Sequence, residues 1–367
     1  MAERGATPNV PRWRRRGLHA VRALFTPLLP DDYLELIDPL WSTRELRGRI
    51  TAIERETAAA VTIRIKPGWE WPGHRPGQYL RVGFRVDGVH HWRAYSLTSE
   101  PGRPDGTIAI TPQLLESGTV TPYLVRTARP GVVVRLGGVE GGFTLPDPPP
   151  GRLLFISAGS GITPVMSMLR HLDRTGAMRD VVHLHSAHGE DDLIFGGELR
   201  ALDRKHADGY RLHIQWTGEQ GRLDPDAMQE RCADWRERET YACGPGEMLD
   251  AIEARWERDD ASEQLHMERF QPVFGGKGHG EGAGGTIRFA ASGIETEGDG
   301  DTPILVAGEE AGAELPFGCR MGVCHTCIGK LCSGQIRDLR TGAVSGAEGE
   351  LVRTCINAAE GPVEIEL

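Results

Sequence analysis

Four cysteines near the C-terminal end of the chain have a spacing that suits an iron–sulfur cluster. Cys319 is followed after four residues by Cys324 and after two more by Cys327, and Cys355 comes after a gap of 27 residues. Two irons need four thiolates, and one tightly curved loop can supply three while a distant segment supplies the fourth. This is the ligand spacing of plant-type [2Fe–2S] clusters. Gly318 and Gly322 suit such a loop, because glycine accepts positive φ and lets backbone N–H groups approach the sulfurs.

A zinc site and a chance clustering are the alternatives for these cysteines. Structural zinc sites use paired Cys-x-x-Cys units, and these four cysteines include one such pair. The spacing therefore favours the cluster. Cys232, Cys243 and Cys332 remain, and this odd count argues against a disulfide framework and for the reducing environment of the cytoplasm.

An iron–sulfur cluster needs an electron source, and residues 93–96 have the side chains that a flavin requires. Arg93 offers a cation for the pyrophosphate, Tyr95 an aromatic plane against the flavin ring, and Ser96 a hydroxyl near N5. An ordinary surface strand is the alternative for this segment. The segment Gly118–Thr121 could place a helix N-terminus, with its free N–H groups, against a phosphate. The loop Gly141–Leu145 could close over the nucleotide half of the cofactor.

A glycine-containing turn at residues 159–164 has the context of a nucleotide-binding turn. It follows an apolar strand, Leu153–Ile156, and precedes a helix, Val165–Leu172, so glycines there can bring N–H groups to a pyrophosphate. It lacks the G-x-G-x-x-G spacing and is weak evidence alone. A second turn follows the strand Thr240–Ala242, at the edge where doubly wound sheets bind ligands. The two turns read Gly159-Ser160-Gly161-Ile162-Thr163-Pro164 and Cys243-Gly244-Pro245.

Two patterns of strands must position these residues. From residue 43 to 147 short alternating strands are separated by Gly and Pro turns, which predicts a small antiparallel β-barrel. One helix interrupts it, with Thr121 as N-cap and Pro122 at its first position. After a Pro-rich linker, strands and helices alternate, which predicts a parallel sheet with helices on its faces. The predicted barrel strands are Val61–Ile65, Tyr79–Val86, His91–Leu97, Thr107–Thr111 and Val132–Leu136; the sheet adds strands Val181–His185 and Arg211–Gln215 and helices Gly197–Lys205 and Glu247–Arg258.

Charge is unevenly distributed along the chain. The net charge is −10, and residues 283–367 carry 6 basic and 13 acidic residues, which would steer this end towards a basic partner surface. Residues 1–30 carry six Arg, one acidic residue and an apolar stretch. This leader is either an interfacial segment that binds anionic lipid or a membrane-bound partner, or a solvated basic tail. It lacks the features of a secretory signal, no run of 18 apolar residues exists, and nothing supports nucleic-acid binding.

Taken together, these stretches resemble the ferredoxin–NADP reductase superfamily. The R-x-Y-S element, the G-x-G-I-T-P turn, the Cys-Gly-Pro edge and the ferredoxin loop occur in the family's order between residues 43 and 367. The resemblance implies that Phe270, which ends the reductase module, could shield the flavin. It also implies flavin contacts for Arg93, Tyr95, Ser96, Gly118, Val120 and Thr121, nicotinamide-nucleotide contacts for Gly159, Ser160, Gly161, Ile162, Thr163, Pro164, Cys243, Gly244 and Pro245, and catalytic roles for Ser96 and Cys243.

The resemblance also implies the domain architecture, with the reductase first and the ferredoxin last, as in phthalate-dioxygenase-reductase-like proteins. Seven glycines between residues 275 and 285 predict a flexible tether before the ferredoxin unit. The longer loop Gly141–Leu145 favours FAD over FMN. The expected divisions are a basic and apolar N-terminal segment 1–42, an FAD-binding antiparallel β-barrel 43–147, an α/β parallel-sheet nicotinamide-nucleotide domain 151–270, a Gly-rich linker 271–285, and an α+β β-grasp ferredoxin domain 286–367.

The choice between NADPH and NADH rests on cationic partners for a 2′-phosphate. In this family the phosphate would lie near Ser186–His188, where the expected Arg is missing, and Arg222 could serve instead, so we favour NADPH. His183 and His185 share a strand face and could be mistaken for metal ligands. Histidines on strands are more often packing or surface groups.

A narrower resemblance concerns the electron acceptor. Residues 27–50 look like those of actinobacterial reductases that supply membrane acyl-CoA desaturases. We therefore expect a membrane-bound di-iron fatty-acyl desaturase as acceptor and a cytoplasmic protein, peripheral at the inner membrane face if residues 1–30 bind there. A soluble ring-hydroxylating oxygenase, or a redox-sensing role, is the alternative. In the expected reaction a hydride passes from NAD(P)H, held between Cys243 and the flavin, to N5 near Ser96, and electrons then leave singly through the cluster.

Overall fold

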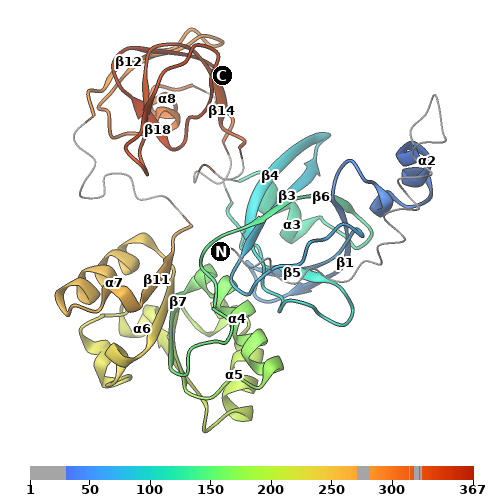
Figure 1. The fold of residues 1–367 in the computed structure, drawn as a ribbon, viewed down its shortest axis with the longest axis vertical. Coiled ribbons are helices and arrows are strands. Elements are labelled where there is room, and N and C mark those ends of the chain that lie inside the picture. The colour runs from blue at the N-terminus through green and yellow to red at the C-terminus, as the bar shows by residue number, and fades with distance from the viewer. Residues whose placement is uncertain (1–29, 117, 271–281, 314, 318–321, 323–324) are drawn as a thin grey trace. The chain divides into compact units, whose positions relative to one another are not determined.

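The computed structural model describes residues 30–116, 118–270, 282–313, 315–317, 322 and 325–367. They form two compact units, of which the first contains a β-barrel and an α/β domain and the second contains the C-terminal domain (Figure 1). Within these ranges no helix combines the length and the apolar character needed to cross a bilayer.

The first domain is a six-stranded antiparallel barrel with the strand order β4-β3-β6-β1-β2-β5. It closes because Leu97, just after β4, pairs with Ile110 of β5. Alternate positions such as Ile63, Leu80 and Phe84 are fully buried, as the period of two in a half-buried strand requires. The strands are β1 (Arg47–Arg55), β2 (Val61–Pro67), β3 (Tyr79–Val86), β4 (Val89–Ser96), β5 (Ile108–Ile110) and β6 (Val133–Glu140).

The helix of the barrel begins earlier than the sequence predicts. Helix α3 spans Val120–Arg126, with Thr119 as its N-cap residue. Thr121 therefore lies inside the first turn, where its Oγ1 accepts a hydrogen bond from the Leu115 N–H at 2.9 Å and donates to the Leu115 carbonyl at 3.2 Å. The prediction that Thr121 is the N-cap is wrong, because its hydroxyl bonds the preceding loop instead of the helix N–H groups.

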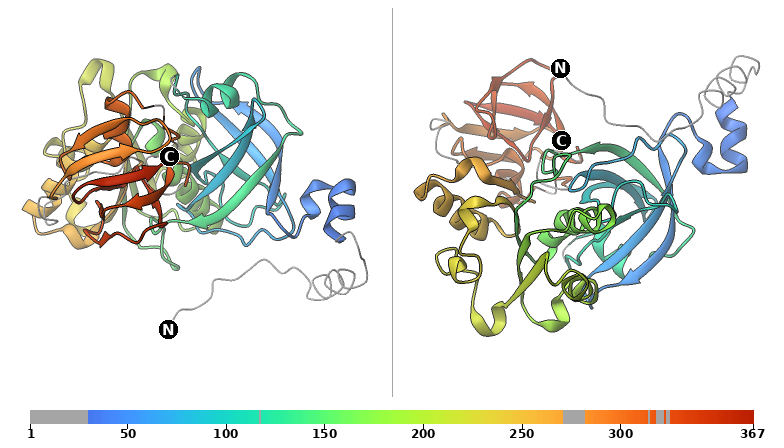
Figure 2. Two further views of the ribbon diagram at one scale, coloured as in Figure 1. Left: turned by 90° about the horizontal axis from the view of Figure 1, so that it is seen from above. Right: turned by 60° about the horizontal axis from the view of Figure 1, so that its bottom comes forward.

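A short helical segment precedes the barrel and lies at its outer end. Helix α2 (Pro30–Ile37) is followed by a single 3-10 turn, η1 (Pro39–Trp41), and both project away from the α/β domain in the two views of Figure 2. Three large apolar side chains are exposed here: Leu36 by 84%, Ile37 by 71% and Trp41 by 44%. Arg49 of β1 ties the segment to the barrel through an ion pair of 2.8 Å with Asp38.

The second domain is a five-stranded parallel sheet with helices on both faces, as predicted. The strand order is β11-β10-β7-β8-β9, with α4 and α5 on one side and α6 and α7 on the other (Figure 1). Strand β7 is a continuous apolar run with both faces buried, which is typical of parallel sheets. The main elements are β7 (Leu153–Ala158), η2 (Gly159–Gly161), α4 (Ile162–Thr175), β8 (Val181–Ala187), α5 (Gly196–Lys205), β9 (Tyr210–Trp216), α6 (Thr217–Gln220), β10 (Glu239–Cys243), α7 (Gly246–Arg258) and β11 (Leu265–Glu268), with short 3-10 turns η3 (Glu190–Asp192), η4 (Ala227–Glu230), η5 (Trp235–Glu237) and η6 (Ser262–Gln264).

The C-terminal domain has the α+β arrangement predicted for it. A five-stranded mixed sheet of order β13-β12-β19-β14-β17 packs against one helix, α8, and a three-stranded sheet, β16-β15-β18, lies beside it. Its core contains Ile287, Phe289, Leu331, Ile356 and Ile365, all fully buried. The elements are β12 (Gly285–Phe289), β13 (Glu295–Gly298), α8 (Ile304–Glu310), β14 (Ile328–Ser333), β15 (Ile336–Asp338), β16 (Val344–Ser345), β17 (Leu351–Arg353), β18 (Asn357–Ala359) and β19 (Val363–Glu366).

Candidate functional site

The three residues predicted to contact flavin lie at the end of strand β4. Arg93 donates from its guanidinium to the Trp92 carbonyl at 2.8 Å, and the Tyr95 ring meets Phe84 edge-on at 6.1 Å between centroids. Ser96 is 6% exposed, and its Oγ has no hydrogen-bond partner among the residues that the structure describes. A buried hydroxyl without a partner carries a desolvation penalty, which a bound acceptor or donor would relieve.

In the second predicted flavin element, Gly118–Thr121, few groups are free to bind a phosphate. The Val120 side chain is 1% exposed and packs in the barrel core. The Thr121 hydroxyl already bonds Leu115. Any contact of Val120 with a phosphate would therefore be made by its backbone N–H. Gly118 donates from its N–H to the Leu115 carbonyl at 2.9 Å, which closes the loop before the helix.

The predicted nucleotide turn and the predicted Cys-Gly-Pro turn lie directly against each other. Gly159, with φ of +51°, ends strand β7, and helix α4 begins at Ile162. A Cβ on Gly161 would lie 2.1 Å from the Cys243 carbonyl oxygen, so only glycine fits. No side chain caps the start of α4; the Ile162 N–H bonds back to the turn at Gly159 and Pro164 has no N–H, so the Thr163 N–H is the group of this first turn that could meet an anion. Thr163 stabilises the turn by donating to the Ser160 carbonyl at 2.8 Å.

Cys243 is a buried thiol at the carboxyl end of strand β10. Its exposure is 0%, and burial, helped by the Glu268 carboxyl, raises the pKa of the thiol well above its usual range. The side chain is therefore a neutral apolar group and no nucleophile at physiological pH. In the sheet register Cys243 pairs with Ser157 on one side and with Glu268 on the other, so these side chains share a face.

Glu268 is a residue of this edge that the sequence analysis missed. Burial raises the pKa of its carboxyl to about 8, and its Oε2 has no hydrogen-bond partner within the part of the chain that the structure describes. It therefore carries a proton at neutral pH. The sequence contained one signal for this residue. If Leu265–Glu268 is recognised as a strand, Glu268 is a carboxylate at the end of that strand. That strand is short, and its polar residues obscured it.

The histidines that could be mistaken for metal ligands form a buried hydrogen-bonded chain. The Ser157 hydroxyl lies 2.8 Å from His183 Nε2 and 2.8 Å from His185 Nδ1, and His183 Nδ1 lies 2.8 Å from the Tyr210 hydroxyl. Burial lowers the pKa of both imidazoles, that of His185 to about 4. Both are therefore neutral at physiological pH. The hydrogen-bonded chain runs across strands β7, β8 and β9, and Ser157 lies two residues before the predicted nucleotide turn.

Two other residues were predicted to contact the cofactors. Arg222 is an exposed side chain that forms an ion pair with Glu247 of α7. Phe270 lies two residues beyond β11 and is half-buried.

Of the four predicted cluster ligands, the structure describes Cys327 and Cys355, while Cys319 and Cys324 lie outside the described residues. Cys327 and Cys355 are buried, at 1% and 2% exposure. The Gly322 N–H donates to the Cys355 sulfur at 3.2 Å, and Gly322 has φ of +69°. The Thr354 hydroxyl donates to the Cys327 carbonyl at 2.9 Å and holds the two ligand segments together. A sulfur that accepts a backbone N–H is what a thiolate ligand of a cluster needs.

Each of the three domains matches a known protein family. Three family models match in chain order: the oxidoreductase FAD-binding domain at residues 58–145, the oxidoreductase NAD-binding domain at 155–254, and the 2Fe-2S iron-sulfur cluster binding domain at 287–359. An NADPH oxidoreductase of Mycobacterium tuberculosis is 47% identical over 361 residues, covering 96% of this chain and 94% of the relative. The chain belongs to the ferredoxin–NADP reductase family. This reductase is thus an NAD(P)H oxidoreductase with FAD-binding, NAD(P)-binding and [2Fe–2S] domains, as the sequence analysis expected.

More distant relatives share the arrangement of the reductase. The reductase subunit of a stachydrine N-demethylase from Rhizobium meliloti is 29% identical and covers 84% of this chain and 92% of its own length. The structure of phthalate dioxygenase reductase matches with a TM-score of 0.56 at 20% identity, over 88% of this chain and 98% of that chain. The fold similarity confirms the predicted fold class, with an antiparallel barrel, a parallel-sheet domain and a ferredoxin domain in one chain.

Proposed function

We propose that this reductase passes electrons from NADPH through FAD and a [2Fe–2S] cluster to an oxygen-activating partner protein. The observation that carries the donor side is the direct contact of the nucleotide turn at Gly161 with the Cys243 edge, where Glu268 ends the adjacent strand. Residues that sequence motifs suggested separately thereby come together at the carboxyl edge of one sheet, where ligands bind in doubly wound folds.

The proposed binding residues follow from this placement. Ser96 supplies a hydroxyl whose unsatisfied state fits a flavin, and the uncapped start of α4 fits a pyrophosphate. We assign flavin contacts to Arg93, Tyr95, Ser96, Gly118, Val120, Thr121 and Phe270, nucleotide contacts to Gly159, Ser160, Gly161, Ile162, Thr163, Pro164, Cys243, Gly244 and Pro245, and cluster ligation to Cys319, Cys324, Cys327 and Cys355.

The chemistry belongs to the bound groups, and the chain orients them. When bound, FAD would supply the change from the two-electron chemistry of NADPH to the one-electron chemistry of the cluster. Ser96 would offer its buried hydroxyl to a bound flavin. Cys243 is fully buried at this edge and adds no charge where the uncharged nicotinamide would bind, because its thiol keeps its proton. Glu268 can hold or release a proton close to physiological pH.

NADPH is the proposed donor. The relative at 47% identity is an NADPH oxidoreductase. Arg222 is the proposed cation for the 2′-phosphate. Its exposed side chain would exchange the Glu247 carboxylate for the phosphate, and a dianionic phosphate is the stronger partner for a guanidinium. Replacing Arg222 with Gln should raise the KM for NADPH and leave the KM for NADH unchanged in steady-state assays with ferricyanide. An equal change for both nucleotides would count against this role.

The proposed acceptor is a membrane-bound di-iron fatty-acyl-CoA desaturase. Residues 27–50 resemble reductases that serve such desaturases, and the exposed Leu36, Ile37 and Trp41 follow a leader with six Arg in residues 1–30. Basic residues beside exposed apolar and aromatic side chains are typical of segments that bind anionic membrane surfaces. This supports a peripheral position at the inner membrane face.

A soluble oxygenase is the second candidate acceptor. It is favoured by relatives that serve as reductase subunits, such as that of a glycine betaine monooxygenase from Pseudomonas aeruginosa, 28% identical over 80% of this chain. The acidic C-terminal domain, with 13 acidic and 6 basic residues, would suit a basic docking surface on either acceptor.

Reconstitution separates the two acceptors. Purified reductase and NADPH should support desaturation of acyl-CoA in membranes that carry a candidate desaturase. Activity with a soluble oxygenase and none with the membranes would overturn the first choice. Slow NADPH oxidation with both ferricyanide and cytochrome c would instead indicate a redox-sensing protein.

A further inference from the structure

The barrel and the α/β domain must be held in a fixed relation if a nicotinamide on one is to meet a flavin on the other. Helix α4 starts at the nucleotide turn, and segment 97–99 continues from Ser96 at the end of β4. Hydrogen bonds between this helix and this segment therefore connect the two binding elements through a few residues of each. Ser167 and Arg170 make these hydrogen bonds, and Glu198 orients Arg170.

Ser167 and Arg170, one turn apart on α4, each donate to a backbone carbonyl of the barrel. The Ser167 hydroxyl, fully buried, donates to the Ser99 carbonyl at 2.7 Å. The Arg170 guanidinium donates from Nη1 to the Thr98 carbonyl at 2.7 Å. Residues three apart on a helix lie on the same face, so the two bonds act side by side. Ser167 lies six residues beyond Gly161, which is about 9 Å of helix.

The Arg170 side chain is fixed from several directions. Its Nε donates to Glu198 Oε1 at 2.8 Å and its Nη2 to Glu198 Oε2 at 2.5 Å, in a two-pronged pair with helix α5. Its guanidinium carbon lies 5.0 Å from the centre of the Phe195 ring. The carboxylate and the ring set the plane of the guanidinium, so the remaining Nη1 points at Thr98. Glu198 thus orients Arg170.

The receiving segment is itself rigid. Thr98 and Ser99 are fully buried. The Thr98 N–H donates to the Ala109 carbonyl at 2.8 Å, and the Ala109 N–H donates to the Ser99 hydroxyl at 3.0 Å. Because this segment is rigid, a hydrogen bond that fixes the backbone of Thr98 also fixes Ser96, two residues earlier in the chain.

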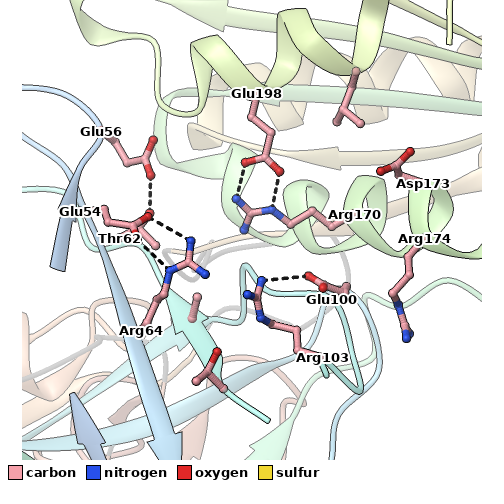
Figure 3. A pocket seen from close by; sticks show the side chains of 13 residues that line it. Glu54, Glu56, Thr62, Arg64, Glu100, Arg103, Arg170, Asp173, Arg174 and Glu198 are labelled. Atoms are coloured by element: carbon pink, nitrogen blue, oxygen red, sulfur yellow. Dashed lines mark hydrogen bonds and ion pairs between the residues drawn. The ribbon is translucent and has the colours of Figure 1, made fainter. Parts of the chain in front are cut away.

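Beside these bonds the two domains are separated by a cavity of about 400 Å³ lined by charged side chains (Figure 3). Its ion pairs each join residues of one domain: Arg64 with Glu54 and Arg103 with Glu100 in the barrel, and Arg170 with Glu198 in the α/β domain. These pairs do not bridge the cavity. At this side of the interface, the hydrogen bonds of Ser167 to Ser99 and of Arg170 to Thr98 join the two domains.

We propose that Arg170, oriented by Glu198 and assisted by Ser167, is a positioning residue that fixes the nicotinamide-binding turn relative to the flavin-binding strand. We call this group the α4 latch. It contacts neither proposed cofactor and acts through the Thr98 and Ser99 carbonyls. Its loss should leave each binding element intact and lower the fraction of complexes in which the reacting atoms are aligned.

The test is anaerobic stopped-flow reduction of the FAD-loaded holoenzyme by NADPH, comparing Arg170→Gln with Arg174→Gln. Arg174 is the matched control, because it is an exposed residue of the same helix that lines the same cavity. We expect flavin reduction in Arg170→Gln to slow about tenfold or more, with the NADPH dependence changed by less than about twofold and FAD content unchanged. The isotope effect with deuterated NADPH should rise, and Arg174→Gln should behave as the parent protein.

Two further measurements separate positioning from general stability. Hydrogen exchange of the amides of residues 97–100 should accelerate in Arg170→Gln and not in Arg174→Gln. Arg170→Lys keeps the charge but cannot bond Glu198 twice and Thr98 at once, so it should restore little of the rate. If Arg170→Gln fails to fold, Glu198→Gln and Ser167→Ala give the same test with smaller expected losses. An unchanged reduction rate in a folded, FAD-loaded variant, or an equal loss in Arg174→Gln, would refute the latch.

Discussion

At the scale of single residues, the edge of the parallel sheet carries two acids whose protons are held by burial. Cys243 keeps its thiol proton because burial, together with the neighbouring Glu268 carboxyl, raises the pKa of the thiol. Glu268 keeps its carboxyl proton because burial raises its pKa to about 8. A neutral edge suits an uncharged nicotinamide ring. It also makes the stability of this domain depend on pH.

Replacing Glu268 with Gln should remove a pH-dependent destabilisation. The folded-state pKa is raised from 4.5 to about 8, so between these values the unfolded chain has lost a proton that the folded chain retains. In that window the free energy of unfolding falls as pH rises, by about 1.4 kcal/mol per pH unit. The variant should therefore melt at a higher temperature than the parent at pH 9 and at the same temperature at pH 4.

Thermal unfolding followed by fluorescence, in steps from pH 4 to 9, checks this prediction. Glu219→Gln, an exposed carboxyl of α6, is the control and should follow the parent at every pH. Parallel pH profiles for the parent and Glu268→Gln would show that the carboxyl is not buried as described.

At the scale of elements, the nucleotide turn depends on a close backbone approach. Substituting Gly161 with Ala places a methyl group 2.1 Å from the Cys243 carbonyl, so β10 or the turn must shift. We expect the KM for NADPH to rise about tenfold or more while FAD remains bound, because the barrel is untouched. Ferricyanide reduction at varied NADPH, together with the flavin spectrum, measures both effects.

Gly197→Ala is the matched control for this substitution. Gly197 lies in the first turn of α5, and a methyl group there meets nothing within 4 Å. It should leave the KM unchanged and slightly stabilise the helix. A rise in the KM of the control, or none in Gly161→Ala, would contradict the proposed geometry.

The elements that could be predicted are those with a local pattern. Strand β3 has the predicted ends, Tyr79 and Val86, because alternation runs between a Pro-Gly turn and an Asp-Gly turn. Strand β1 (Arg47–Arg55) was missed, because four charged side chains hide its alternation, and its place depends on pairing with β2 and β6. Helix α4 extends beyond its predicted ends to Gly176, which caps it in the left-handed region.

Sequence reasoning could propose candidate site residues where a motif is contiguous, and it missed contacts that are assembled from distant strands. Segment 93–96 and the nucleotide turn are read directly from the chain. The bond of Arg170 to Thr98 joins residues 72 positions apart, and that of Ser157 to His183 joins residues 26 apart. No local pattern encodes such a contact, because it depends on which strands become neighbours in the sheet.

At the scale of the whole molecule, the ferredoxin domain is a compact unit with its own core. Cys355→Ser should therefore abolish the cluster and leave the flavin site functional. We expect loss of the cluster absorbance and of cytochrome c reduction, with NADPH-dependent ferricyanide reduction retained within about twofold. Cys332→Ser is the control and should keep the cluster. Loss of ferricyanide reduction in Cys355→Ser would show that the domains depend on each other for folding.

The N-terminal end of the molecule makes a second prediction at this scale. Deleting residues 1–30, or replacing Leu36, Ile37 and Trp41 with Ser, should weaken co-sedimentation with vesicles of anionic lipid and leave ferricyanide reduction unchanged. Binding should also fall with added salt, because part of the attraction is between Arg and lipid phosphate. Leu115→Ser, an exposed apolar residue elsewhere on the barrel, is the control. Undiminished vesicle binding in both variants would remove the support for a membrane-bound acceptor.

The buried chain of Tyr210, His183, Ser157 and His185 has a consequence for hydrogen placement. A neutral imidazole carries one hydrogen, so the chain can keep every hydrogen bond while using the Ser157 hydroxyl hydrogen in two ways. Either Tyr210 donates first and the hydrogen of His185 lies on Nε2, or His185 donates from Nδ1 and the hydrogen of His183 lies on Nδ1. The tautomers of the two rings are therefore locked together. A change in the hydrogen bond at Tyr210 would therefore switch His185 Nδ1, at the other end of the chain of hydrogen bonds, between donor and acceptor.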